Sequence, residues 1–103
     1  MTNNLITQAF KELRKLGYEA HQSVSINEAR ILAMFHDKFV FYYKHERKNL
    51  RERGIVFIKF IGDPRIIIEV LERNGIKTEW NGNNGKAIKI QLPHRQEKNS
   101  NGS

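Results

Sequence analysis

Apolar residues recur with the period of a helix near the amino end of the chain. They stand at Leu5, Ile6, Ala9, Phe10, Leu13 and Leu16, and charged residues fall between them. Gly17 follows as a typical helix stop, because glycine readily takes the left-handed conformation that ends many helices. The pattern predicts a helix with one buried side, ending near residue 16.

A second helix is predicted from about Ile26 to Phe35. Ser25 and Glu28 have the spacing of a capping box, in which each side chain binds an unpaired backbone N–H at the start of a helix. The expected apolar face consists of Ile26, Ala29, Leu32, Ala33 and Phe35. Ile31 and Met34 fall outside this face, so a strand is the alternative for this segment.

The third helix begins at Asp63 and Pro64. Asp63 can cap it, and Pro64 has the backbone angle that suits a first helical position. Ile67, Val70 and Leu71 form its apolar stripe, and Gly75 ends it.

In the stretch KFVFYYKH the period changes to two. Phe39, Phe41 and Tyr43 share one side of the expected strand, while Val40 and Tyr42 share the other. Both sides are apolar, which is typical of a central strand.

IVFIKFI, residues 55–61, is a similar strand in which Lys59 is the only charge. The connection ERKNLRERG has Leu50 as its one large apolar residue, so it is expected to be a marginal exposed helix or a loop. The two strands it joins are expected to pair in antiparallel fashion.

Three further strands complete the pattern. Residues 19–24 follow the first helix, and IKTEW and KAIKIQL flank the turn NGNNG as a hairpin. The order predicts an α+β domain with a mostly antiparallel sheet of four or five strands and two or three helices packed on one face. Residues 1–93 are expected to form a single compact domain, and residues 94–103 a disordered polar tail.

Composition narrows the classes of function. The formal net charge is +7, with 18 Lys and Arg against 11 Asp and Glu, which favours encounters with acidic partners or polyanions. The chain has no cysteine, which excludes disulfides, thiolate metal sites and cysteine nucleophiles and fits the cytoplasm. The first residues have no unbroken apolar run, so we expect no signal peptide and no membrane span.

Catalytic and metal-binding patterns are not found. His36-Asp37 and His45-Glu46 are sequence neighbours, whose side chains point to opposite faces of a strand. The four histidines lack metal-ligand spacing. NGNNG lies between two strands, so no helix amino end would face a phosphate there. We therefore expect a non-enzymatic protein with no cofactor and no metal.

The chain resembles a family of uncharacterised bacterial domains over roughly residues 5–92. The shared order is an aromatic strand ending in polar residues, a glycine-led strand, a helix, and a hairpin with Trp80-Asn81-Gly82. The family's cysteine cluster is absent around Gln22 to Ile31, and Tyr43 and Glu46 stand where the family has His and Asp. The resemblance implies a fold and no activity.

The sequence predicts a basic binding surface. Its candidate residues are Lys44, His45, Arg47, Lys48, Arg51 and Arg53, with Trp80 as an interface anchor. An acidic protein partner is expected, as for an adaptor, inhibitor or immunity-type protein. Nucleic acid is the alternative, with Tyr42 or Tyr43 stacking on bases. A solvated turn with local ion pairs, and a Trp80 that caps the core beside Ile76, are the simpler interpretations.

Overall fold

Five strands form one mixed sheet in the computed structural model, which describes residues 4–80, 82 and 87–93. The strands are β1 (Glu19–Val24), β2 (Phe39–Tyr43), β3 (Ile55–Ile61), β4 (Lys77–Glu79) and β5 (Ile88–Gln91), in the spatial order β1-β2-β3-β5-β4. β1 pairs parallel with β2, and the other neighbours pair antiparallel. The predicted α+β class with a mostly antiparallel sheet is confirmed.

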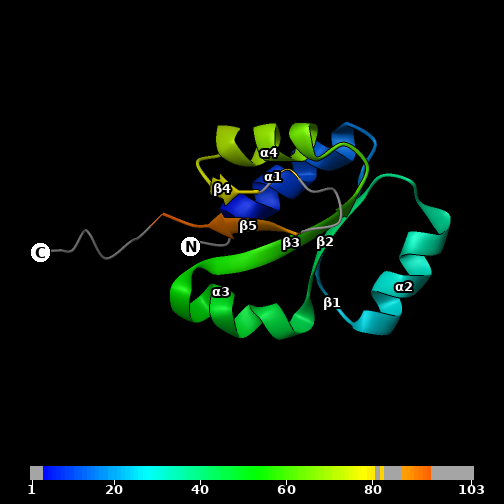
Figure 1. Ribbon diagram of the computed structural model, residues 1–103, viewed down its shortest axis with the longest axis horizontal. Coiled ribbons are helices and arrows are strands. Elements are labelled where there is room, and N and C mark those ends of the chain that lie inside the picture. Colours follow the sequence, from blue (N-terminus) through cyan, green and yellow to red (C-terminus); the bar gives the residue numbers. More distant parts are fainter. Residues whose placement is uncertain (1–3, 81, 83–86, 94–103) are drawn as a thin grey trace, which may run out of the picture.

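The described residues form four helices, three of which connect strands. They are α1 (Asn4–Lys15), α2 (Ile26–Phe35), α3 (Arg47–Arg53) and α4 (Pro64–Arg73), with a 3₁₀ turn over Lys44–Glu46 before α3. α1 and α4 pack together on one face of the sheet, as predicted, while α2 lies apart from them (Figure 1). For the connection between β2 and β3 the sequence allowed either a marginal helix or a loop, and the structure has the short helix α3 there.

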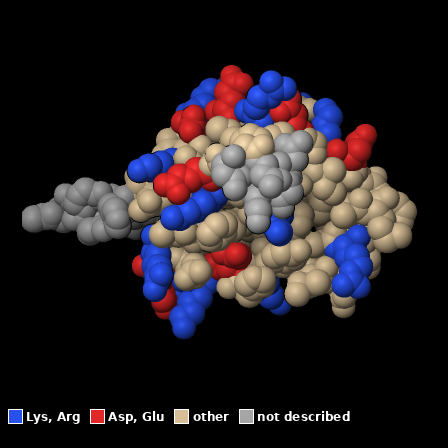
Figure 2. All heavy atoms as spheres, viewed as in Figure 1, with Lys and Arg blue, Asp and Glu red and all other residues tan. Residues whose placement is uncertain are grey.

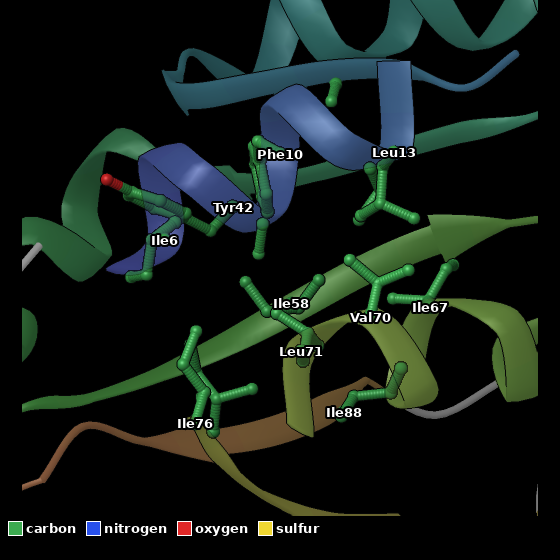
Figure 3. Packing of buried hydrophobic residues seen from close by; sticks show 14 of the residues in the cluster. Ile6, Phe10, Leu13, Tyr42, Ile58, Ile67, Val70, Leu71, Ile76 and Ile88 are labelled. Atoms are coloured by element: carbon green, nitrogen blue, oxygen red, sulfur yellow. The ribbon is translucent and has the colours of Figure 1, made fainter. Parts of the chain in front are cut away.

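The main core fills the space between the sheet and the pair α1 and α4. Phe10 and Leu13 of α1 meet Tyr42 and Ile58 of the sheet there, and Leu71 of α4 closes the other side (Figure 3). All five are buried. The apolar stripes of the first and third predicted helices, apart from Leu16, therefore pack in the main core, as their period predicts.

The second face of the sheet carries a smaller core. Phe39 and Phe41 point away from the main core and pack with Val24 and with Ala29 of α2. Their rings stack on each other, with centroids 4.5 Å apart. β2 is therefore buried on both faces, as its two-residue period predicts.

Both predicted helix starts are confirmed. The Ser25 hydroxyl accepts a hydrogen bond from the Glu28 N–H at 3.1 Å, and the Glu28 carboxylate accepts one from the Ser25 N–H at 3.3 Å. Asp63 accepts the Arg65 N–H at 2.9 Å, with Pro64 at the first helical position. Most of the NGNNG turn and residues 94–103 lie outside the described residues.

Two predictions about burial are wrong. Leu16 follows the end of α1 and is half exposed. The predicted apolar face of α2 is not buried as a unit, since Ile26 and Phe35 are exposed and only Ala29 is fully covered. α2 packs on the sheet through Ala29 and part of Leu32, and this leaves Ile26 and Phe35 exposed.

Replacing Phe10 by Ala tests the main core. Phe10 is fully buried against Tyr42, so we expect Phe10→Ala to lower the free energy of unfolding by about 3–5 kcal/mol. Phe35→Ala is the matched control, because 74% of the Phe35 side chain is exposed; it should change stability by no more than about 0.5 kcal/mol. Urea unfolding measures both, and equal losses would contradict this packing.

Candidate binding surface

α3 is held at the end of the sheet by one apolar side chain and one tight turn. Leu50 is its only buried residue and joins the main core. Gly54 ends the helix with a φ of 69° and accepts a hydrogen bond from the Leu92 N–H at 2.8 Å. A Cβ at Gly54 would make only ordinary contact with Leu92, so it is the left-handed backbone angle that favours glycine at this position. The other side chains of α3 are left to face solvent.

The cationic side chains of this segment are exposed and unpaired. Lys44, Arg47, Lys48, Arg51 and Arg53 are all exposed. No ion pair found between described residues includes any of them. At the lower left of Figure 2, where α3 lies in Figure 1, several Lys and Arg side chains lie together with some acidic ones among them. The local ion pairs that the sequence suggested for a solvated turn are not formed in the part of the chain that the structure describes.

The cations of α3 do not all point the same way. Successive helical residues are rotated by about 100°, so Arg47, Lys48 and Arg51 fall within one sector. Arg53 lies on the other side of the buried Leu50. The structure therefore brings three of the predicted binding residues together and sets Arg53 apart from them.

The acidic residues within this segment offset the positive charge only in part. One carboxylate oxygen of Glu46, Oε1, is buried and has no hydrogen-bond partner in the described structure, so it is turned away from solvent. Glu52 is exposed, but no ion pair found between described residues joins it to Lys48 one turn earlier. Arg47, Lys48 and Arg51 consequently present a net positive surface, which we call the α3 basic surface.

A row of rings connects α3 to the second face of the sheet. Phe41 meets Tyr43 edge to face at 5.3 Å, and the exposed His45 stacks on Tyr43 at 5.3 Å with an interplanar angle of 16°. Tyr43 is half-buried, whereas Tyr42 points into the main core, where its hydroxyl donates to Gln22 Oε1 at 3.1 Å. Of the two tyrosines proposed for stacking, only Tyr43 is reachable.

A groove of about 380 Å³ lies between α2 and the second face of the sheet. Its lining residues are Ile26, Ala29, Arg30, Ala33, Phe41, Tyr43, Lys59, Phe60, Ile61 and Ala87. Eight of these ten are apolar or aromatic, two are cationic, and none of these lining residues is acidic. One feature of the sequence could have indicated this site: Lys59 is the only charged residue in an otherwise apolar strand.

The outer side of α2 is apolar as well. Met34 and Phe35 are each 74% exposed, and Ile31 is exposed beside them. The right-hand part of Figure 2, where α2 lies in Figure 1, shows few charged side chains. Exposed apolar surface of this kind is typical of a protein-binding site.

Trp80 does not join the α3 basic surface. It is half-buried, packs against the main core and meets Phe60 edge to face at 6.3 Å. It follows β4, and it lies on the same face as Ile76, which is buried. The interpretation of Trp80 as a cap on the core therefore describes its position better than that of an interface anchor.

Two histidines lie beside one carboxylate at the edge of the sheet. His21 Nε2 is 2.7 Å from Glu19 Oε2, and since an ionised carboxylate only accepts, the imidazole donates. His36 Nε2 lies 3.9 Å from the other oxygen of Glu19. Of the two histidines that neighbour a carboxylate in the sequence, His36 lies near Glu19 and His45 stacks on Tyr43.

This cluster does not amount to a metal site. No group of three or more His, Asp or Glu residues within the described ranges is placed to hold a metal ion. No helix in those ranges is long and apolar enough to cross a membrane.

Comparison with known proteins adds no identification. No protein-family model, curated protein or solved structure matches this chain. The resemblance to the uncharacterised bacterial domains stays a prediction, and the function has to be argued from the surface itself.

The hydrogen bond from His21 lowers the pKa of Glu19 below its ordinary 4.5, and the nearby His36 acts in the same direction. A lowered folded pKa stabilises the protein above pH 4.5, and this contribution is lost as the pH falls through the folded pKa. We expect the free energy of unfolding to fall more steeply below pH 5 for the wild type than for Glu19→Gln, by about 1 kcal/mol or less because the pair is partly exposed. Urea unfolding at pH 3–7 measures this, and parallel profiles would contradict it.

Proposed function

We propose that this protein is a non-enzymatic binding domain that docks on an acidic protein partner through the α3 basic surface. The observation that carries the proposal is that Arg47, Lys48 and Arg51 are exposed and outside every ion pair found between described residues. Partner carboxylates can bind these cations without breaking an internal ion pair. The net charge of +7 adds long-range attraction, which accelerates the encounter.

The apolar groove that reaches toward the cations, and the exposed apolar residues of α2 further away, favour a protein over a simple polyanion. Protein interfaces combine an apolar centre with a charged rim. Here α2 exposes Ile31, Met34 and Phe35, and the groove beside α2 reaches Tyr43, on which His45 stacks just before α3. A highly charged and uniformly polar ligand would leave that apolar surface in water.

Charge reversal of the α3 basic surface tests the proposal. The variant R47E/K48E/R51E should fold normally, because all three side chains are exposed, and should bind fluorescein-labelled poly-L-glutamate at least about tenfold more weakly. Fluorescence anisotropy measures the affinity, and circular dichroism checks the fold.

The control K11E/K15E/K77E changes three exposed cations elsewhere. Each reversal removes two units of charge, so both variants lower the formal net charge from +7 to +1. The control should lose much less affinity than the α3 variant. Equal losses would show that net charge alone attracts the probe, and the α3 basic surface would then have no special role.

Single-stranded nucleic acid is the second candidate. The observation that favours it is an aromatic pair on the second face of the sheet, Tyr43 on β2 and Phe57 on β3, with Phe57 42% exposed. Phe57 on β3 lies opposite Lys89 on β5, so this exposed ring has a lysine beside it. Exposed rings beside lysines on a sheet can stack bases and contact phosphates.

This candidate makes its own prediction. If single-stranded nucleic acid is the ligand, Phe57→Ala should weaken the binding of a labelled deoxythymidine oligonucleotide by about tenfold, because a lost stack costs roughly 1–3 kcal/mol. Phe35→Ala, on the distant outer side of α2, should not change the affinity. Anisotropy titrations at 50 and 150 mM salt measure both. If Phe57→Ala leaves the affinity unchanged and binding is lost at 150 mM salt, the interaction is only nonspecific attraction between charges.

A further inference from the structure

The groove beside α2 has the shape and chemistry of a second contact site. We propose that it receives an apolar side chain of the acidic partner, with a carboxylate of the partner close by in sequence placed against Arg30 and Lys59. This inference rests on the proposed function and adds to it the kind of segment that the partner presents, an acidic stretch carrying a large apolar residue.

The groove exists because α2 meets the sheet through small side chains. Ala29 is the buried residue of α2, and Ala33 one turn later lines the groove without filling it. Phe41 and Tyr43 form the opposite wall, on the second face of β2. A volume of about 380 Å³ lies within the range of ligand-binding clefts, so a large apolar side chain fits there.

The charges at the groove select for an acidic segment. Arg30 of α2 and Lys59 of β3 line it from two sides. No ion pair found between described residues includes either cation, and no acidic residue is among the described residues that line the groove. A carboxylate next to the inserted side chain would therefore meet two unpaired cations.

The groove is continuous with the α3 basic surface. Tyr43 lines the groove, His45 stacks on Tyr43 with ring centroids 5.3 Å apart, and α3 begins two residues after His45. One extended acidic segment can therefore place an apolar side chain in the groove and its acidic neighbours along α3. This continuity is the reason for assigning the groove to the same partner.

Two synthetic peptides that differ in one residue test the inference. The first is acetyl-Glu-Glu-Glu-Phe-Glu-Glu-amide, and the second has Ser in place of Phe. We expect the Phe peptide to bind about tenfold more tightly, because only its ring leaves water in the groove. In ¹⁵N spectra of the full chain, the Phe peptide should shift the amides of Ala29, Ala33, Phe41 and Lys59 together with those of α3. The Ser peptide should shift the α3 amides alone.

A variant that fills the groove tests the contribution of the groove to affinity separately from that of the cations. Ala33→Phe places a ring in the groove from an exposed helical position and leaves every cation in place. It should remove the advantage of the Phe peptide and leave the affinity for the Ser peptide unchanged. The control Met34→Phe adds a ring at the neighbouring exposed position, which does not line the groove, and should keep the tenfold preference.

The outcomes distinguish the two proposals. Equal binding of both peptides with shifts confined to α3 would overturn the groove inference and leave the proposed function standing. Shifts in the groove without shifts in α3 would overturn the proposed function. Binding of neither peptide would overturn both. Amides of α2 and the groove that shift on dilution of the free protein would show that a second copy of the chain occupies the groove, which would also overturn the inference.

Discussion

The burial of β2 on both faces is the constraint on which the rest of this structure depends. Val40 and Tyr42 point into the main core, while Phe39 and Phe41 point into the second cluster. A slip of one residue in the pairing would exchange these two sets, placing the Tyr42 hydroxyl and its hydrogen bond to Gln22 on the wrong face. Since β1 and β3 pair on either side of β2, its register also determines where α2 and α3 leave the sheet.

The two faces of the sheet are covered unequally, and this difference produces the candidate site. α1 and α4 cover the main core with long apolar side chains and are joined by Glu12, which accepts hydrogen bonds from Arg73 and Asn74. α2 covers the second face with Ala29 and part of Leu32. A helix with so little buried area has a low cost of local opening. We infer that α2 can adjust to a partner more readily than α1 or α4.

The sequence predicts an element well where its signal is local. The period of residues 5–13, the capping box at Ser25 and Glu28, and Asp63 with Pro64 are each contained within a few turns of chain, and each is confirmed. The alternation in FVFYY is equally local and correctly assigns both faces of β2.

The predictions are less complete where the answer depends on segments far apart in the chain. The parallel pairing of β1 with β2 sends α2 to the second face of the sheet, and nothing within residues 26–35 indicates that choice. The residue type of Ile26 and Phe35 predicts burial, but burial requires a neighbouring surface that this chain does not provide. The sequence does not predict the groove for the same reason. An unfilled space depends on how two elements face each other, and neither segment of sequence reveals it alone.

If the protein binds an acidic partner as we propose, the α3 basic surface and the groove would act on different steps of binding. Attraction between charges reaches over about 8 Å at physiological salt and chiefly raises the rate of encounter. An apolar side chain in the groove acts only after contact and is little affected by salt, so it chiefly slows dissociation. A surface with only the cations of α3 would attract many acidic proteins with little discrimination. The groove would add a requirement for shape, and its two unpaired cations, Arg30 and Lys59, would favour an apolar residue flanked by acidic ones. Selectivity would therefore come from the coincidence of the two features within one short segment.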